Sequence, residues 1–179
     1  ARVDFVDIDE RSYNMSVVAL RGKLEKAKKA GNLPKVVMPV HFSGQSCDMK
    51  EIAGLAQKYG FSIIEDASHA IGGRYLGKAV GSCEYSSITV FSFHPVKIVT
   101  TGEGGMAVTN DPKLAARMRL LRTHGITRDV AMMKNPLPGP WYYEQIDLGF
   151  NYRMTDMQAA LGASQMQRID SFVRRRHAL

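Results

Sequence analysis

Short apolar runs alternate with longer stretches in which apolar residues recur every three or four positions along the first third of the chain. Three apolar runs predict strands, at residues 3–7, 36–40 and 61–64. Two stretches predict amphipathic helices that each end at a glycine, at residues 16–30 and 48–59. Strands that alternate with helices favour a mostly parallel sheet covered by helices, so the pattern predicts an α/β fold.

Beyond residue 70 the predicted strands follow one another more closely. A short pair is expected around residues 74–80, and single strands at 88–93 and 106–109. Asp111 followed by a proline predicts a capped helix. Residues 125–150 contain several prolines and predict a long irregular loop, after which one helix is expected to run to the C-terminus. No repeat or low-complexity tract interrupts this order, which predicts one domain.

Polar side chains gather at the ends of two predicted strands. Asp66 follows the run 61–64, Ser92 lies near the end of the run 88–93, and Lys97 precedes the glycine-rich segment 102–105. In open parallel sheets, ligands bind outside the carboxyl ends of the strands. A lysine can form a Schiff base with a cofactor aldehyde, and a carboxylate can keep a ring nitrogen protonated. This combination indicates pyridoxal phosphate (PLP).

Each of these residues also has an interpretation without chemistry. Lys97 alone would be a solvent-exposed lysine, and Asp66 alone a turn residue or a helix cap. Ser92 could be a buried strand hydroxyl, and the glycines at 102, 104 and 105 could simply permit a tight turn. Their occurrence in one order strengthens the interpretation as a cofactor site, but the residues by themselves leave both interpretations open.

The composition is ordinary for a globular protein. Of the 179 residues, 45% are hydrophobic and 23% charged, and no apolar stretch approaches the length of a membrane span. The N-terminal residues predict a strand and not a signal peptide. The formal net charge is +7, but the basic residues are spread along predicted helices without interleaved aromatic residues. We therefore expect solvated helix faces, no nucleic-acid or membrane partner, and a field that favours a phosphorylated ligand.

Cysteine and histidine usage indicates no metal site. Cys47 and Cys83 form no metal-spaced pair, and the five histidines include no His-x-x-x-His pair. Reduced cysteines favour a cytoplasmic protein. The sequence also lacks the glycine motifs of nucleotide-binding loops and the Gly-x-Ser-x-Gly elbow. The chain starts in the middle of a pattern and ends in a basic helix, so we expect it to be part of a longer protein.

Four segments resemble one family. Residues 65–70 (EDASHA), 91–97 (FSFHPVK), 101–105 (TGEGG) and 149–154 (GFNYRM) are similar in order and spacing to the motifs of the DegT/StrS family. Its members are PLP-dependent aminotransferases that act on nucleotide-linked keto sugars. The resemblance covers nearly the whole chain. The run SFHPVK is most similar to the branch that makes amino sugars of the pseudaminic-acid type.

The resemblance implies roles for four residues in one subunit. Lys97 would form the Schiff base with PLP, and Asp66 would pair with the pyridinium nitrogen. Ser92 would bind the cofactor phosphate, and His69 would lie near the ring and its phenolic oxygen. Some members carry histidine in place of this lysine and act as dehydratases, so Lys97 favours transamination.

Three further residues are candidates for contacts beyond the cofactor ring. By the resemblance, Asn151 would reach the cofactor phosphate of a neighbouring subunit, which implies a homodimer with shared active sites. Arg153 and His94 are the candidate substrate contacts. Without the resemblance, Asn151 would be a loop cap and Arg153 part of a surface salt bridge. The segment 41–45 matches a family loop to which we assign no role.

The resemblance therefore implies a fold-type-I aminotransferase large domain. Residues 1–179 would form most of this PLP-binding domain, without the family's N-terminal segment and without its C-terminal small domain. The longer protein would transfer an amino group, from glutamate, to a keto carbon of a nucleotide sugar in amino-sugar or polysaccharide biosynthesis. The 179 residues alone would be inactive. The alternatives are a non-catalytic regulator or binding protein with the same fold, and a basic nucleic-acid-binding domain.

Overall fold

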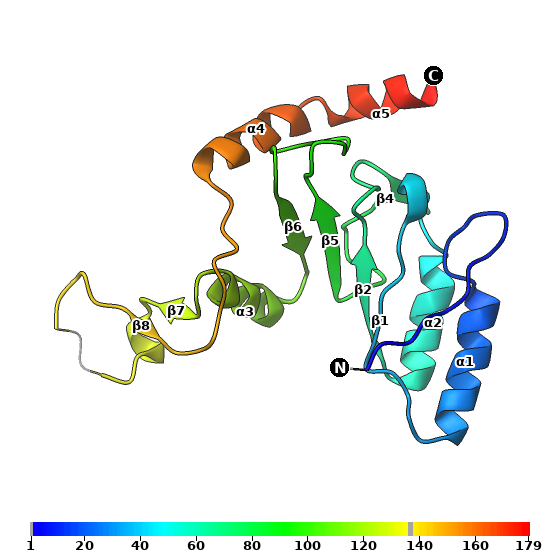
Figure 1. Ribbon diagram of the computed structural model, residues 1–179, viewed down its shortest axis with the longest axis horizontal. Coiled ribbons are helices and arrows are strands. Elements are labelled where there is room, and N and C mark those ends of the chain that lie inside the picture. Colours follow the sequence, from blue (N-terminus) through cyan, green and yellow to red (C-terminus); the bar gives the residue numbers. More distant parts are fainter. Residues whose placement is uncertain (1, 136–137) are drawn as a thin grey trace. The chain divides into compact units, whose positions relative to one another are not determined.

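A computed structural model describes residues 2–135 and 138–179 (Figure 1). Pro136 and Leu137, which belong to the predicted irregular loop, lie outside the described residues, as does Ala1. The chain forms two compact units. The larger unit comprises residues 1–110 and 156–179, and the smaller unit comprises residues 111–155.

The larger unit is built on a four-stranded sheet in the order β1-β2-β5-β6. The strands are β1 (Val36–Val37), β2 (Ser62–Asp66), β5 (Ile88–Ser92) and β6 (Gly105–Val108). The first three are parallel, whereas β6 is antiparallel to β5. The register aligns Asp66 with Val90. The carboxyl ends of β2 and β5 therefore lie together at one end of the sheet (Figure 1).

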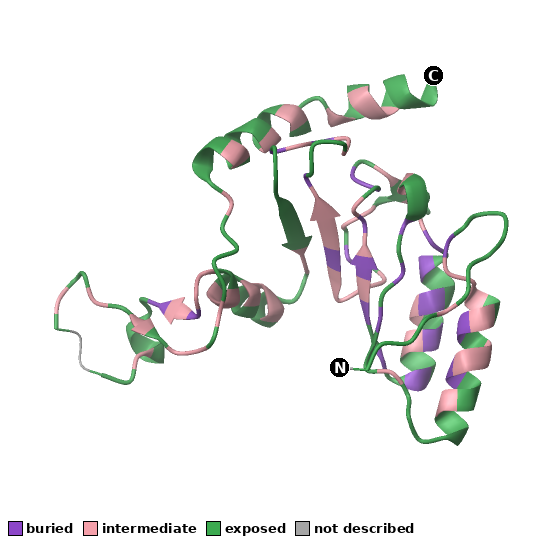
Figure 2. Cartoon of the chain, in the orientation of Figure 1, coloured by how far each residue is buried: buried purple, intermediate pink, exposed green. Residues whose placement is uncertain are grey.

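Two helices enclose the hydrophobic core with β1 and β2. These helices, α1 (Val17–Lys29) and α2 (Met49–Tyr59), lie side by side (Figures 1 and 2). The Ser16 hydroxyl accepts a hydrogen bond from the N–H of Ala19 at the start of α1, and the left-handed Gly60 ends α2. The core includes Leu20, Leu24, Ile52, Leu55 and Ile63. Burial of each such side chain stabilises the fold by about 1.5–3 kcal/mol.

A hairpin and two C-terminal helices complete the larger unit. The strands β3 (Arg74–Tyr75) and β4 (Lys78–Ala79) pair in antiparallel orientation. The helices α4 (Asp156–Met166) and α5 (Ile169–His177) run across the end of the sheet at which β2 and β5 finish (Figure 1). Their surfaces, like that of β6, are mostly exposed or half-buried (Figure 2). The core thus lies on the α1–α2 side of the unit.

The smaller unit combines one helix with a short hairpin. The helix α3 (Pro112–Arg122) begins at Asp111, whose carboxylate accepts hydrogen bonds from the N–H groups of Lys113 and Leu114. The strands β7 (Ile126–Thr127) and β8 (Glu144–Gln145) are antiparallel, and a 3-10 turn spans Val130–Met132. The N–H of Phe150 donates to the carbonyl of Leu121 at 2.8 Å. This bond ties the segment before α4 to the end of α3.

The structure confirms the predicted α/β architecture but corrects several elements. Residues 3–7 form no strand, and only Ile8 makes an isolated bridge, to Met15. The strand predicted at 36–40 is reduced to β1, because Pro39 has no N–H to continue the ladder. The stretch 125–150 contains β7 and β8 and is not wholly irregular. The single C-terminal helix is in fact two helices, which are separated at residues 167–168.

Candidate active site

Asp66 lies at the carboxyl end of β2 and is half-buried. Its N–H donates to the carbonyl of Pro39 at 2.9 Å, and its own carbonyl accepts from the N–H of His41 at 3.0 Å. These bonds fix its backbone against the neighbouring segment. One carboxylate oxygen, Oδ1, accepts from the N–H of Ser68 at 3.0 Å. The other accepts no hydrogen bond from residues 2–135 or 138–179, so it can accept one from a cationic donor.

Ser92 ends β5, the strand next to β2. Its Oγ accepts from the N–H of His94 at 3.3 Å, which leaves the hydroxyl proton available to a ligand. Lys97 follows in the segment 93–104 that joins β5 to β6, which we call the lysine loop. The N–H of Lys97 donates to the carbonyl of His94 at 3.0 Å and makes a tight turn. The structure thus brings Asp66, Ser92 and Lys97 to the same end of the sheet.

Backbone hydrogen bonds close the lysine loop at its base. The N–H of Phe93 donates to the carbonyl of Gly104 at 2.8 Å, and the N–H of Thr101 donates to the carbonyl of Phe93 at 3.0 Å. Gly102 and Gly104 have φ angles of 79° and 155°, which favour glycine. Val99 is completely buried within the loop. The glycines therefore permit the turn that closes the lysine loop at its base.

His69 is exposed and follows Asp66 by three positions. Its ring lies edge-on to Phe42, with centroids 6.4 Å apart. Gly44 has a φ of 89°, and a Cβ at this position would lie 2.9 Å from the carbonyl oxygen of His69. The segment 41–45, to which the sequence assigns no role, therefore packs against the turn that carries His69. His94 is also exposed, and its imidazole lies 4.0 Å from the carboxylate of Glu103.

A buried hydrogen-bond network lies behind Asp66 on the same strand. Glu65 and His41 are 6% and 0% exposed, and Oε2 of Glu65 is 2.7 Å from Nε2 of His41. Nδ1 of His41 accepts from the N–H of Cys47 at 3.1 Å, so Nε2 carries the proton and donates to Glu65. The hydroxyls of Ser86 and Thr89 also donate to Glu65. The His41 imidazole therefore donates from Nε2 to the Glu65 carboxylate.

The electrostatics of Glu65 follow from these contacts. Burial raises the pKa of this carboxyl, but hydrogen bonds from His41, Ser86 and Thr89 outweigh burial and hold the pKa below its ordinary value. Burial also raises the pKa of the Cys47 thiol to about 11, so this thiol is protonated at neutral pH and is a poor nucleophile. Sequence reasoning missed the network. The sequence signals were a histidine, His41, in the segment without an assigned role and an acid, Glu65, directly before Asp66.

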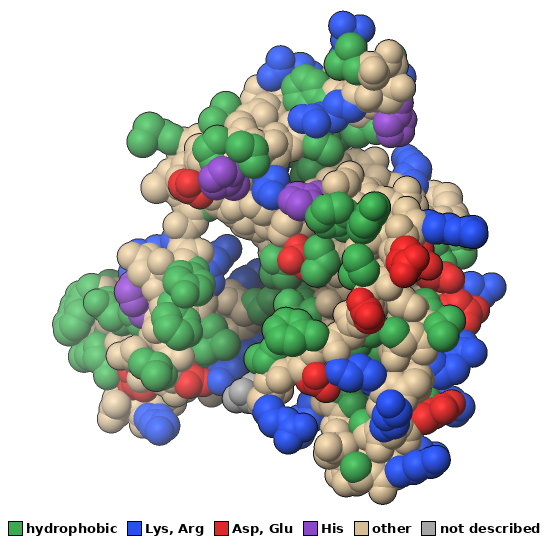
Figure 3. Space-filling view, turned by 45° about the vertical axis from the view of Figure 1, so that its right-hand side comes forward, with side chains coloured by type: hydrophobic (Ala, Val, Ile, Leu, Met, Phe, Trp, Pro, Cys, Tyr) green, Lys and Arg blue, Asp and Glu red, His purple; other side chains and the backbone are tan. Residues whose placement is uncertain are grey.

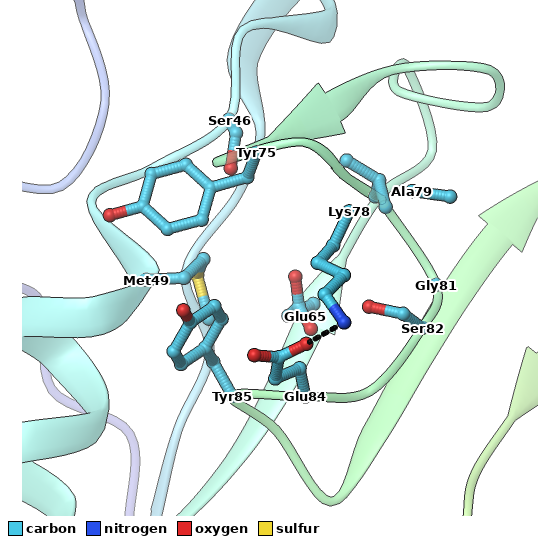
Figure 4. Close-up of a pocket in the computed structure, with 11 residues that line it drawn as sticks. Ser46, Met49, Glu65, Tyr75, Lys78, Ala79, Gly81, Ser82, Glu84 and Tyr85 are labelled. Carbon is cyan, nitrogen blue, oxygen red and sulfur yellow. Dashed lines mark ion pairs between the residues drawn. The ribbon is translucent and has the colours of Figure 1, made fainter.

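The hollow drawn in Figure 4 lies beside Glu65 and the β3–β4 hairpin. Tyr75 and Tyr85 line it with their rings 5.7 Å apart and edge-to-face, and Lys78 pairs with Glu84 across its mouth at 3.4 Å. None of Asp66, Ser92 and Lys97 lines this hollow. Successive strand residues point to opposite faces of a sheet, so Glu65 faces this hollow while Asp66 points away from it.

Asn151 and Arg153 belong to the smaller unit, apart from the other predicted site residues. Asn151 is exposed and forms an isolated bridge with Thr123. Arg153 lines a hollow with His124, Arg128 and Tyr143, and the Arg128 guanidinium lies 5.9 Å from the centre of the Tyr143 ring. The lining of this hollow thus includes two guanidinium groups, those of Arg128 and Arg153.

The remaining surface carries little further indication of chemistry. Lys and Arg side chains are interspersed with acidic and apolar ones on the face shown in Figure 3 and form no continuous patch there. Among the described residues, no group of three or more His, Cys, Asp or Glu side chains could hold a metal ion. No helix in the described chain is long and apolar enough to cross a membrane.

The side chains at the sheet end suit a phosphorylated, cationic-ring cofactor. Asp66 offers a carboxylate oxygen with acceptor capacity, Ser92 offers a hydroxyl donor, and Lys97 offers an amine from a turn that its own backbone fixes. A helix-covered, mostly parallel sheet with these groups is the large domain of a fold-type-I PLP aminotransferase, as similar solved structures show.

Comparison with known proteins identifies the family. Residues 1–179 match the DegT/DnrJ/EryC1/StrS aminotransferase family, and the chain belongs to it. Aminotransferases of this family depend on PLP. GDP-perosamine synthase of Caulobacter vibrioides is 43% identical over 165 residues, which cover 92% of this chain and 39% of that protein. UDP-4-amino-4,6-dideoxy-N-acetyl-beta-L-altrosamine transaminase of Campylobacter jejuni is 39% identical over 179 residues, which cover 100% of this chain and 44% of that protein.

A solved structure gives the same result. Helicobacter pylori PseC, an aminotransferase involved in the biosynthesis of pseudaminic acid, superposes with a TM-score of 0.80 at 32% identity, over 93% of this chain and 40% of that one. One relative carries a different description. The pleiotropic regulatory protein of Geobacillus stearothermophilus is 36% identical over an alignment of 181 positions, which covers 99% of this chain and 43% of that protein. The chain therefore spans less than half the length of the relatives that it matches.

Proposed function

We propose that these residues carry part of the active site of a PLP-dependent aminotransferase that transfers an amino group, from glutamate, to a keto carbon of a nucleotide-linked sugar. The observation that carries the proposal is the placement of Asp66 and Ser92 at the ends of adjoining parallel strands, followed by Lys97 in a loop that its backbone fixes. The sugar-nucleotide transaminases among the relatives support this substrate class. Amino-sugar or polysaccharide biosynthesis, including the pseudaminic-acid branch, is the proposed setting.

The proposed roles of the residues are those that the family resemblance implies, and their places at the sheet end support them. Asp66 accepts a hydrogen bond from the ring nitrogen and keeps it protonated, because a carboxylate favours the cationic form. The Ser92 hydroxyl donates to the phosphate. The bound cofactor supplies an electron sink for charge that develops on a substrate carbon. Lys97 holds the cofactor and then moves a proton at that carbon, and His69 lies beside the ring.

The smaller unit has a proposed role in a shared site. Asn151 reaches the cofactor phosphate of a second subunit in a homodimer, and Arg153 and His94 contact the substrate. The guanidinium of Arg128, which lines the same hollow as Arg153, supports contact with an anionic sugar nucleotide. Residues 1–179 are proposed to form most of the PLP-binding large domain of a cytoplasmic enzyme. The proposal is for the complete protein, and these residues alone are proposed to be inactive.

Chemical trapping tests the central assignment. The complete protein, saturated with PLP, is reduced with borohydride, digested and mapped by mass spectrometry. We expect the pyridoxyl group on the peptide that contains Lys97, and its loss from this peptide in a Lys97→Arg variant that remains folded. Labelling of Lys78 or Lys113 in place of Lys97 would show the assignment to be wrong.

A non-catalytic regulator with the same fold is the second candidate function. The relative described as a pleiotropic regulatory protein favours it. The intact set of Asp66, Ser92 and Lys97 favours the enzyme, because a regulator has no need of a proton-transferring lysine. Mixing the PLP-loaded protein with glutamate separates the two: an aminotransferase bleaches the visible band of the bound cofactor and releases 2-oxoglutarate, whereas a regulator leaves both unchanged.

A further inference from the structure

One side chain of α4 makes a pair of hydrogen bonds to the backbone of the lysine loop. Nε2 of Gln165 donates to the carbonyl of Thr100 at 2.6 Å, and Oε1 of Gln165 accepts from the N–H of Thr100 at 3.2 Å. Both polar ends of one amide therefore bind the donor and the acceptor of a single residue. This pairing fixes the position of the Thr100 peptide groups, as a neighbouring strand would.

Two further residues of α4 contact the same loop. Nε2 of Gln158 donates to the carbonyl of Glu103 at 3.1 Å. Gly162 faces Thr101 so closely that a Cβ would lie 2.8 Å from the Thr101 methyl group. Residues 158, 162 and 165 recur at the spacing of one helix face. One face of α4 therefore lies directly against the second half of the lysine loop.

Thr100, which Gln165 binds, lies close to Lys97 in the lysine loop. Thr100 follows Lys97 by three positions, and its hydroxyl donates to the carbonyl of Phe93 at 3.0 Å. Val99 between them is completely buried. The loop is thus held at the N–H of Lys97, by the turn to His94, and three residues later at Thr100, by Gln165.

We propose that Gln165 is a positioning residue for the reaction: by binding both backbone polar groups of Thr100, it fixes the lysine loop and so sets where the Lys97 amine lies. The inference rests on the proposed function, since it assigns a role to Lys97. Gln165 does not contact substrate or cofactor in this role. Its effect is on the geometry of the loop before any ligand binds.

The test compares three variants of the complete protein. Gln165→Met keeps the size of the side chain and removes both hydrogen bonds. Gln165→Glu keeps the acceptor for the Thr100 N–H and removes the donor. Gln57→Met, at an exposed position inside α2, is the matched control. Hydrogen exchange of the cofactor-free proteins is measured by mass spectrometry. The PLP-loaded proteins give kcat and KM, and kcat is divided by the fraction of chains that borohydride labels at Lys97 in a parallel sample.

We expect peptides from the lysine loop to exchange roughly tenfold faster in Gln165→Met, since two hydrogen bonds are lost, and at least as fast in Gln165→Glu, since a carboxylate oxygen would face the Thr100 carbonyl oxygen. We expect kcat to fall about tenfold in Gln165→Met while KM for the nucleotide sugar stays constant, because a misplaced amine slows proton transfer without weakening substrate binding. The control should match the parent protein in both measurements.

The outcomes separate the two proposals. Suppose that the parent protein is labelled at Lys97 but that both Gln165 variants have the parent's kcat and the parent's hydrogen exchange in the lysine loop. The positioning role is then wrong and the proposed function stands. If Gln165→Met does not fold, Gln165→Glu decides by the same two measurements. If the parent protein is not labelled at Lys97, the proposed function fails and the positioning role fails with it.

Discussion

Glu65 is a charged group held inside the protein by donors from three separate segments. His41 comes from the segment before α2, Ser86 from the turn before β5, and Thr89 from β5 itself. A buried carboxylate is costly unless it is fully hydrogen-bonded. The network therefore joins these segments to β2 directly behind Asp66, and its charge adds to the negative potential near the candidate site.

Replacement of Glu65 by glutamine should destabilise the protein in a pH-dependent way. The amide cannot accept from all three donors, so we expect a loss of about 1–3 kcal/mol near neutral pH. The folded pKa of Glu65 is lowered, so its contribution is present above the unfolded pKa and is lost as pH falls through the folded pKa. Urea unfolding of both proteins at neutral and acid pH should therefore show the difference narrowing in acid.

Glu51→Gln is the matched control for this measurement. Glu51 is exposed and lies 3.7 Å from Arg21, so its replacement should cost no more than about 0.5 kcal/mol. The free energies of unfolding of the parent protein and Glu65→Gln should differ less in acid. A difference that stays constant from neutral to acid pH would contradict the assignment of an ionised, hydrogen-bonded carboxylate.

Asp66→Asn should leave the fold intact and lower the rate. An amide cannot stabilise a protonated ring nitrogen, so we expect kcat to fall by about a hundredfold or more. Circular dichroism checks the fold, and turnover with a nucleotide keto sugar gives the rate. Asp170→Asn, at an exposed position in α5, should keep full activity. Turnover of Asp66→Asn near that of the control would remove Asp66 from the proposed chemistry.

The sequence alone located the strand-end residues because their positions follow from simple rules. Asp66 and Ser92 end apolar runs, and parallel strands finish at one end of a sheet. The contact between Gln165 and Thr100 could not be predicted in this way. It joins residues 65 positions apart, and nothing local in the sequence marks which face of a helix meets which loop.

The helix α4 depends on a small residue to approach the lysine loop. Gly162 faces the Thr101 methyl group, and Thr101 is 3% exposed with its hydroxyl bonded to the carbonyl of Glu103 at 2.7 Å. Thr101 therefore has little freedom to move away. A larger side chain at position 162 would push α4 and the loop apart.

Gly162→Ala should consequently destabilise the protein, although alanine favours helices over glycine by about 0.8–1 kcal/mol. The overlap with Thr101 should outweigh this gain and raise hydrogen exchange in the lysine loop. Gly54→Ala in α2 is the control, because a Cβ there meets nothing within 4 Å, and it should raise the melting temperature. An equal rise in both variants would show that α4 can accommodate a methyl group at this contact.

Long patterns predicted α1, α2 and β2 better than short ones predicted β1, β7 and β8, although the short pair β3–β4 was also predicted. α1, α2 and β2 have apolar positions over enough residues to be recognised, whereas β1, β7 and β8 contain two residues each. Pairing with a neighbour, and not local preference, decides such short strands. The break between α4 and α5 also has no proline or glycine to mark it at residues 167–168.

The residues proposed to share a site belong to different compact units of the chain. Lys97 belongs to the larger unit and Asn151 to the smaller one. The proposed two-fold dimer would take Lys97 of each site from one subunit and Asn151 from the other. Each site would then require both chains.

Mixing two inactive variants of the complete protein tests this arrangement. With free subunit exchange between equal amounts of Lys97→Ala and Asn151→Ala, half of the dimers are mixed and each has one intact site. We therefore expect about a quarter of the parent activity. The control mixture of Lys97→Ala with Asp66→Asn should stay inactive, because both residues come from the same subunit. No recovery despite exchange confirmed by native mass spectrometry would place Asn151 in its own subunit's site.

The antiparallel pairing of β5 with β6 also bears on how the protein folds. This pair closes only the lysine loop, whereas β2 reaches β1 across α2 and reaches β5 across the β3–β4 hairpin. Contacts between nearby segments cost less chain entropy and form sooner. The β5–β6 hairpin is therefore suited to be an early template to which β2 and β1 are added. We predict that substitutions in the lysine loop slow folding, because they act on the closure of this hairpin.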